Sequence, residues 1–431
     1  MKRHHINVIS LGCSKNLVDS EHLLRQLQAA GYTVEHDPDM VNGEIVVVNT
    51  CGFIADAQQE SIDTILAMGQ AKREGRIRRL YVLGCLAERF MADLMAELPE
   101  VDKFYGKFNW HQLIADLGHS YSNRLADERI LTTPKHYAYL KISEGCNRFC
   151  AFCAIPLITG RHKSMPIERV LAQVEHLTAQ GVKEFNVIAQ DLSSYGLDLY
   201  GEMRLPELVD RMAQMPGVEW IRLHYAYPTQ FPMDLLPVMA RNDNVCNYLD
   251  IALQHISDAV LTNMRRHITG VDTRKLIERL RREVPNLHLR TTLMVGFPGE
   301  GEREFDELLD FVRETRFERM GAFAYSEESG TYAAEHYRDE IPHDVKQQRL
   351  QQLMDEQEII SQEIQEQKIG KTLRVMIDHE EPGHFVGRTE WDSPEVDPEV
   401  LVDKTLALKV GEFCNVKVDE ALPFELIAHP V

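Results

Sequence analysis

No stretch of this chain is apolar for the roughly 18 residues that a membrane-spanning helix needs. The first ten residues also lack the sustained apolar segment of a secretory signal. Cysteine is scarce, with 8 in 431 residues, and without a signal this favours reduced thiols that act as ligands over a disulfide framework. We therefore expect a cytoplasmic protein with no membrane association.

Positive charge is in short supply as well. The chain has 47 Lys and Arg against 67 Asp and Glu, a net charge of −20. Non-specific nucleic-acid binding depends on basic surface, so this composition argues against it and favours a basic partner.

Three apolar strand patterns occupy the first part of the chain, and each one leads into a cysteine. These expected strands are 6–11, 44–49 and 80–83. Helical patterns separate them, which predicts a parallel sheet. Cys13, Cys51 and Cys85 follow the carboxyl ends of the strands, where open α/β sheets bind ligands. The three thiols are expected to meet at that edge, although three separately buried thiols would occupy the same positions.

The middle of the chain repeats the alternation of strand and helix six times. The expected strands are 137–142, 184–189, 220–225, 248–253, 287–295 and 320–325. This indicates a curved parallel sheet or partial barrel with its site at the carboxyl ends of the strands. A long helical pattern over 342–368 then leads to short alternating runs, which predict a small antiparallel β module. Residues 371–431 carry 6 Lys and Arg against 13 Asp and Glu.

The segment EGCNRFCAFC follows the first strand of the repeat and contains Cys146, Cys150 and Cys153. A disulfide would leave one thiol over, and a structural zinc site needs four ligands, which the neighbouring residues do not supply. A four-iron cluster held by three thiolates keeps one iron open. That iron can bind the amino and carboxylate groups of S-adenosylmethionine, with the protein positioning and shielding the reaction.

The CxxxCxxC spacing, with Phe152 before its last cysteine, resembles the radical S-adenosylmethionine superfamily. SLGCSKN at 10–16, NTCGFI at 49–54 and VGFPGE at 295–300 extend the resemblance along the chain to the methylthiotransferase family. It implies an α/β protein of three domains. These are a parallel-sheet N-terminal domain (1–130), a partial (βα)6 radical SAM barrel (131–366) and a small antiparallel β-barrel of the TRAM type (367–431).

The resemblance also implies two [4Fe-4S] clusters and S-adenosyl-L-methionine as cofactors. Cys146, Cys150 and Cys153 would hold the radical-generating cluster, and the other three cysteines a cluster that handles sulfur. Phe152, Gln190, Gly296 and Glu300 are expected to contact S-adenosylmethionine, although Gly296 to Glu300 also reads as an ordinary tight turn. Phe149 reads as core packing under the cluster loop. The sequence identifies no catalytic acid or base.

Within the family, the SLGCxKN and NTCGFI versions resemble the protein-modifying branch. This implies that the substrate is an aspartate of small-subunit ribosomal protein twelve, converted at its β-carbon to 3-methylthioaspartate. An external electron donor and a sulfur source would be needed. The acidic β module agrees with a lysine-rich protein partner. The alternatives are the same chemistry on tRNA adenosine, a non-catalytic iron–sulfur carrier and a zinc-stabilised RNA-binding module.

Overall fold

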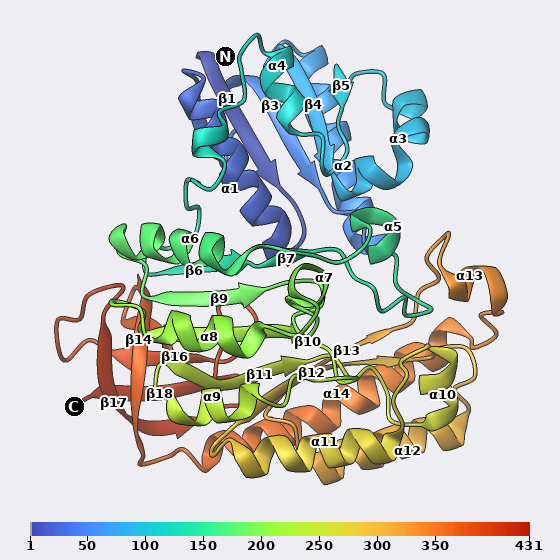
Figure 1. Ribbon diagram of the computed structural model, residues 1–431, viewed down its shortest axis with the longest axis vertical. Coiled ribbons are helices and arrows are strands. Elements are labelled where there is room, and N and C mark those ends of the chain that lie inside the picture. Colours follow the sequence, from blue (N-terminus) through green and yellow to red (C-terminus); the bar gives the residue numbers. More distant parts are fainter. Residues whose placement is uncertain (1) are drawn as a thin grey trace.

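The computed structural model describes residues 2–431 and consists of three parts (Figure 1). A five-stranded sheet forms the upper part, a six-stranded sheet with its helices the middle part, and a closed β-barrel the lower left part. Within residues 2–431, no helix combines the length and the apolar character needed to cross a membrane.

The upper sheet is parallel and has the order β2-β1-β3-β4-β5. Its strands are β1 (Lys2–Ser10), β2 (Thr33–His36), β3 (Gly43–Thr50), β4 (Arg79–Gly84) and β5 (Lys103–Phe104). Its helices are α1 (Ser14–Ala29), α2 (Ala55–Arg73), α3 (Cys85–Glu97) and α4 (His111–Asp116). The three predicted strands are confirmed as β1, β3 and β4, whereas β2 and β5 are edge strands too short to give a pattern.

The central strands of this sheet are apolar throughout because both of their faces are covered. Val46 and Val48 belong to one hydrophobic cluster, whereas Ile45 and Val47 belong to another on the opposite face. In Figure 1 the arrowheads of β1 and β3 point toward the middle part. The carboxyl edge of the upper sheet therefore faces the rest of the molecule.

The middle sheet has the order β13-β12-β11-β10-β9-β6, and its strands are parallel. The strands are β6 (Tyr137–Lys141), β9 (Glu184–Ile188), β10 (Trp220–Ala226), β11 (Val245–Ile251), β12 (His288–Val295) and β13 (Arg319–Ala324). All six predicted strands are thereby confirmed. The main helices are α6 (Ile167–Ala179), α8 (Leu205–Ala213), α9 (Leu235–Arg241), α11 (Gly270–Glu283), α12 (Glu302–Thr315) and the long α14 (His343–Glu366). The shorter elements are η1 (Asn123–Leu125), β7 (Ser143–Glu144), α5 (Ile155–Thr159), β8 (Lys163–Ser164), α7 (Leu197–Tyr200), α10 (Asp258–Asn263) and α13 (Tyr332–His336).

The C-terminal part is a closed barrel in the order β14-β15-β16-β18-β17. Its strands are β14 (Thr372–Glu381), β15 (His384–Arg388), β16 (Glu399–Asp403), β17 (Phe413–Ala421) and β18 (Glu425–Pro430). The pairs are antiparallel except β16 with β18, which is parallel and closes the barrel. The predicted small β-barrel is thus present, with one parallel pair that the alternating pattern did not reveal.

Buried ion pairs attach this barrel to the middle sheet. Arg388 donates to Glu184 Oε2 at 2.8 Å, and Glu184 also accepts from Arg222 at 3.0 Å. Asp392 pairs with Arg319, and both side chains are buried. Part of the acidity of the β module is therefore internal, so its net charge overstates the charge that it offers to a partner.

Candidate functional site

The first cysteine set lies at the carboxyl edge of the upper sheet. Cys51 and Cys85 come directly after β3 and β4, and Cys13 comes three residues after the end of β1; these strands are neighbours in the sheet. The loops approach so closely that a Cβ on residue 12, where glycine has φ +88°, would lie 2.8 Å from Cys51 Sγ. A Cβ on residue 52 would likewise lie 2.7 Å from the carbonyl carbon of Cys85. The structure thus brings the three predicted residues to one edge.

The second set, Cys146, Cys150 and Cys153, lies in the loop after β7, and two of its sulfur atoms accept hydrogen bonds. The backbone N–H of Arg148 donates to Cys146 Sγ at 3.4 Å, and Arg266 Nη1 donates to Cys150 Sγ at 3.2 Å. Such donors stabilise thiolate sulfur in iron–sulfur proteins.

Arg266 supports a negatively charged group beside Cys150. Its side chain is buried, and no carboxylate within residues 2–431 lies at ion-pair distance from it. An unpaired buried guanidinium is costly, so the missing negative charge fits a thiolate-ligated cluster. Sequence reasoning overlooked Arg266, because nothing in its neighbourhood along the chain connects it with Cys150.

Burial raises the pKa of the Cys85 and Cys146 thiols to about 12. Neither thiol ionises on its own at neutral pH, and a bound metal cluster would supply the positive charge that stabilises the thiolates. Within residues 2–431, no three His, Cys, Asp or Glu side chains lie as close together as the ligands of one metal ion. A tetrahedral zinc site places its sulfur atoms about 3.8 Å apart, whereas a four-iron cube spreads its thiolates more widely.

A largely buried polar network connects the two sets, and we call Asp19, Lys107, Lys141 and Glu144 the charge quartet. Lys107 Nζ donates to Asp19 Oδ2 at 2.8 Å and lies 3.8 Å from Glu144 Oε1. Lys141 pairs with Asp19 and, at 2.9 Å, with Glu144. Burial would raise the pKa of Asp19, but the two ammonium groups outweigh it and hold that pKa below its usual range. Asp19 and Lys107 belong to the upper part and the other two to the middle part, so the quartet fixes how the two parts meet.

Gln190 is attached to this quartet. Its amide nitrogen donates to Glu144, while its Oε1 is buried and has no hydrogen-bond partner within residues 2–431. A buried acceptor without a donor fits a ligand that brings one. The role of Gln190 toward S-adenosylmethionine stays a prediction.

The other expected cofactor contacts occupy the turn after β12 and the cluster loop. The Glu300 carboxylate accepts from Gly296 N at 2.9 Å and from Arg349 Nη1 at 2.8 Å, and it lies 3.2 Å from His255 Nε2. These partners occupy both of its oxygens, so Glu300 holds the turn in shape. The Phe152 ring packs edge-on against Phe297, with 6.1 Å between the ring centres. Contact of these residues with the cofactor stays a prediction.

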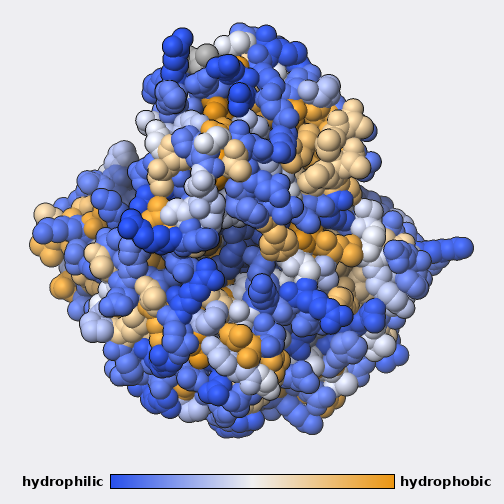
Figure 2. All heavy atoms as spheres, turned by 45° about the horizontal axis from the view of Figure 1, so that its top comes forward, coloured by the Kyte–Doolittle hydropathy of each residue, from blue (hydrophilic) through white to orange (hydrophobic). Residues whose placement is uncertain are grey.

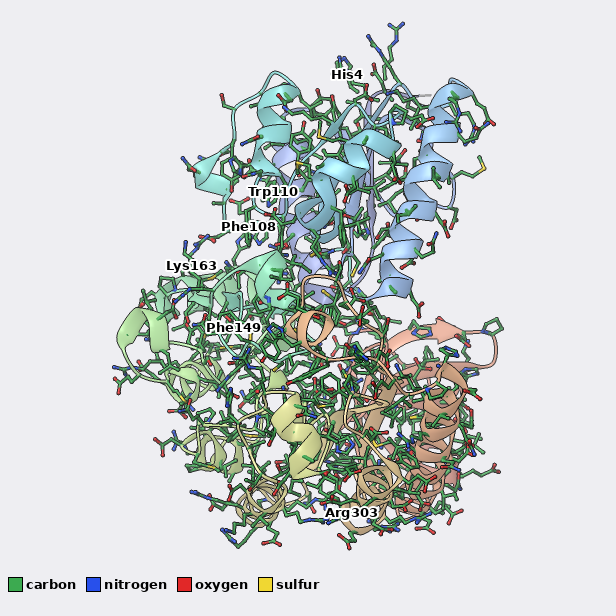
Figure 3. The ribbon with its side chains drawn as sticks, turned by 90° about the vertical axis from the view of Figure 1, so that its right-hand side faces the viewer. His4, Phe108, Trp110, Phe149, Lys163 and Arg303 are labelled. Atoms are coloured by element: carbon green, nitrogen blue, oxygen red, sulfur yellow. The ribbon has the colours of Figure 1, made fainter. Side chains whose placement is uncertain are left out.

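The expectation that Phe149 packs in the core is wrong. Its side chain is 47% exposed and its φ is +49°, which turns the ring outward from the cluster loop. Phe108, in the upper part, is exposed to a similar degree. Figure 3 shows these two residues at facing margins of the upper and middle parts. In the view of Figure 2, the surface is hollowed where these parts meet, and apolar residues border the hollow.

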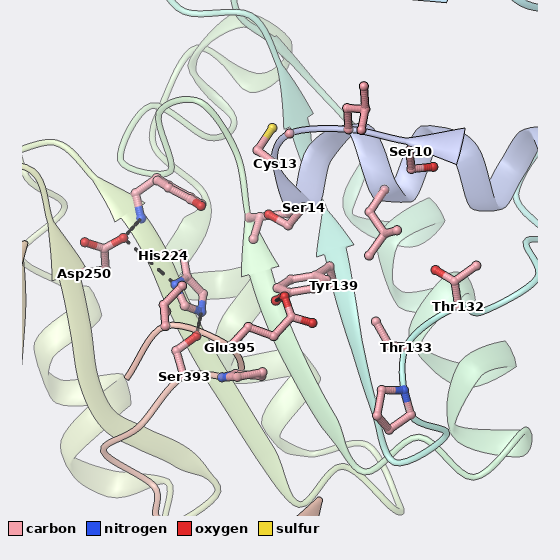
Figure 4. A pocket seen from close by; sticks show the side chains of 18 of the residues that line it. Ser10, Cys13, Ser14, Thr132, Thr133, Tyr139, His224, Asp250, Ser393 and Glu395 are labelled. Atoms are coloured by element: carbon pink, nitrogen blue, oxygen red, sulfur yellow. Dashed lines mark hydrogen bonds and ion pairs between the residues drawn. The ribbon is translucent and has the colours of Figure 1, made fainter. Parts of the chain in front are cut away.

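A cavity of about 500 Å³ lies between the three parts of the molecule. Its walls are residues 10–14 of the upper part, Tyr139, His224 and Arg290 of the middle sheet, and residues 393–396 of the barrel. Figure 4 shows Cys13 and Ser14 above the cavity, with His224 and Glu395 below them. Glu395 accepts hydrogen bonds from the hydroxyls of Tyr137 and Tyr139. The barrel therefore contributes directly to a cavity beside Cys13. The sequence did not predict this contribution, because residues 393–396 are far from Cys13 along the chain.

Comparison with known families divides the chain in the same way. Residues 5–106 match the uncharacterized protein family UPF0004, residues 140–312 the radical SAM superfamily, and residues 369–431 the TRAM domain.

Proteins described as ribosomal protein uS12 methylthiotransferase RimO match over nearly their whole length. The one from Parabacteroides distasonis is 62% identical over 99% of each chain. Those from Porphyromonas gingivalis and Christiangramia forsetii are 61% and 50% identical, and each match covers all of this chain. Among solved structures, the radical S-adenosylmethionine methyltransferase TsrM from Kitasatospora setae, with cobalamin and a [4Fe-4S] cluster bound, has a TM-score of 0.57 over 77% of each chain. At 14% identity this likeness concerns the fold alone.

Proposed function

This chain belongs to the family of ribosomal protein uS12 methylthiotransferases, and we propose that it places a methylthio group on the β-carbon of one aspartate of that ribosomal protein. The product would be 3-methylthioaspartate. The arrangement of the cysteines is the observation that carries the proposal. Two sets of three thiols follow the carboxyl ends of two parallel sheets, and the charge quartet lies between them.

The enzyme uses [4Fe-4S] clusters and S-adenosylmethionine, as its family does. We assign one cluster to Cys146, Cys150 and Cys153, and a second to Cys13, Cys51 and Cys85. When bound, these groups supply a radical that removes hydrogen from an unactivated C–H bond, together with the sulfur and methyl group of the product.

The protein's own residues hold and shield this chemistry. The quartet sets the separation of the two cysteine sets, and Arg266 balances the charge at Cys150. The cavity beside Cys13 accommodates the target side chain away from bulk water, which protects a reactive intermediate. The exposed rings of Phe108 and Phe149 suit a protein substrate, because aromatic side chains are enriched in protein interfaces.

We further propose three domains with boundaries at 130/131 and 366/367, a cytoplasmic location, an external electron donor and a separate sulfur source. Elements of the middle sheet and its helices run from β6 to α14, which ends at Glu366, and the barrel begins at Thr372. None of the eight cysteines, all within residues 2–431, forms a disulfide, which is compatible with a reducing compartment. Modification of tRNA adenosine is not favoured, since the full-length relatives carry the protein-modifying name.

The test supplies the anaerobically reconstituted enzyme with S-adenosylmethionine, a reductant, and a mixture of unmodified small ribosomal subunits and tRNA. Mass spectrometry of both pools is expected to find a methylthio group on an aspartate of uS12. The same group on tRNA would refute the substrate. Cys146→Ala is expected to abolish cleavage of S-adenosylmethionine, whereas Cys51→Ala retains some 5′-deoxyadenosine formation without product. Equal loss in both variants would contradict the division of roles.

A further inference from the structure

The first turn of α1 borders the cavity and has the character of an anion site. The helix has 16 residues and begins at Ser14, immediately after Cys13. No acidic residue lies in its first turn, and no side chain caps it. The first N–H groups of a helix lack partners within the helix and carry partial positive charge, which favours a bound anion.

Two side chains at this turn are buried without the partners that they need. The Ser14 hydroxyl lines the cavity, and its oxygen is buried without a hydrogen-bond partner within residues 2–431. The Lys15 side chain is only 8% exposed, and no carboxylate in the described chain lies at ion-pair distance from its ammonium group. Instead, Lys15 Nζ lies 2.9 Å from the centre of the Tyr225 ring, which forms part of the cavity wall. The charge of Lys15 acts on the Asp250 carboxylate, which also lines the cavity, but the two groups are beyond ion-pair distance. A buried ammonium group without a directly paired carboxylate has unused capacity for a negative partner.

The other cationic groups around the cavity are already engaged. Arg290 lies 3.5 Å from Asp250 and 3.3 Å from Asp397. Burial, together with nearby arginines, holds the pKa of His224 well below its usual value, so this ring is neutral. His36, also in the cavity wall, lies 3.2 Å from Asp37. Among these groups of the described residues, Lys15 is the cation without a carboxylate at ion-pair distance.

Resting on the proposed function, we propose that Ser14, Lys15 and the first turn of α1 bind the carboxylate of the substrate aspartate. In aspartate the carboxylate is attached to the β-carbon, which is the carbon that receives sulfur. The group that holds the carboxylate must therefore lie next to the cluster that delivers sulfur. Ser14 and Lys15 directly follow Cys13, which we assign to that cluster. Such a site would favour an acidic side chain over a neutral one of similar shape.

The methionyl carboxylate of S-adenosylmethionine shares this chemistry, so the experiment separates the two sources. Binding of uS12 and of S-adenosylmethionine to the reconstituted enzyme is measured by calorimetry, with uS12 carrying either aspartate or asparagine at the target position. The wild type is expected to bind the aspartate form more tightly. Lys15→Met should weaken binding of that form by about 30-fold or more and abolish the discrimination, since one partner of a buried charge pair is lost.

Three further variants make the result decisive. Lys15→Arg retains the charge and should preserve most of the discrimination, and Ser14→Ala should weaken binding by about 5-fold through one lost hydrogen bond. The control is Lys103→Met, because Lys103 pairs with Asp116 at the surface of the same part. Iron content and far-UV circular dichroism verify that each variant is folded; if Lys15→Met is not, Ser14→Ala and Lys15→Arg decide.

The possible outcomes are distinct. Unchanged discrimination in Lys15→Met overturns the proposal, as does a loss confined to S-adenosylmethionine binding. If the wild type neither binds nor modifies uS12, the proposed function fails. If the wild type modifies uS12 and Lys15→Met discriminates between the two forms of uS12 as well as the wild type does, only the carboxylate site is refuted.

Discussion

Replacing Asp19 with asparagine tests whether the charge quartet holds the two cysteine sets in place. Asp19 accepts from Lys107 and Lys141, and its removal leaves one buried and one largely buried ammonium group to share Glu144. Removing one partner of a buried ion pair costs about 3–5 kcal/mol. Glu144 stays 2.9 Å from Lys141 and 3.8 Å from Lys107 and still partly balances both charges. We therefore expect the free energy of unfolding to fall by an amount at the lower end of this range, about 3 kcal/mol.

The assay is urea unfolding at neutral pH, followed by far-UV circular dichroism. With an m value of about 3 kcal/mol/M, the transition that includes the upper part should move down by about 1 M. Asp210→Asn is the control, because Asp210 pairs with Arg241 at the surface, where an ion pair contributes less than about 1 kcal/mol. In the reconstituted enzyme, Asp19→Asn should also form less methylthiolated product for each S-adenosylmethionine cleaved.

A shift no larger than that of Asp210→Asn would refute the reasoning. The double variant Asp19→Asn/Lys107→Met provides a second criterion. Removing both partners of a buried pair costs less than removing one, so the double variant should be more stable than the sum of the two single effects predicts. Additive effects would mean that the two side chains do not interact.

Three other predictions concern Arg266, the barrel junction and its pH dependence. Arg266→Met should lower the reduction potential of the cluster assigned to Cys150 by about 60 mV in an EPR-monitored titration, because a nearby positive charge favours the added electron. Arg266→Lys keeps the positive charge, so its reduction potential should stay close to that of the wild type. Arg388→Met should destabilise the attachment of the barrel by about 3 kcal/mol, seen as earlier proteolysis at the junction, and full resistance would contradict the role of its pair with Glu184. Burial would raise the pKa of Asp392, but Arg319 outweighs it and lowers that pKa to about 2. Its contribution of about 2 kcal/mol is therefore present above pH 4 and lost as the pH falls toward 2, so the stability gap to Asp392→Asn should narrow over that range.

Local patterns were sufficient for most of the fold. The continuous apolar run at 44–49 gave a central strand because both faces of β3 are covered, and the six repeated units gave the middle sheet. The sequence did not predict the short edge strand β5, because a strand of two residues shows no periodicity. It did not predict the parallel pair β16–β18 either, because a barrel closes through contacts between residues that are distant in sequence.

By itself, the sequence determined the chemistry. Two sets of three cysteines, each placed after apolar strands, specify ligands and the sheet edges where they lie, because strand and ligand are adjacent along the chain. Only the tertiary structure brought Arg266 to Cys150, paired Asp19 with Lys141, and left Lys15 buried against Tyr225 without an acidic partner. Whether a buried charge is balanced depends on which side chains from remote segments surround it, and no local pattern contains that information.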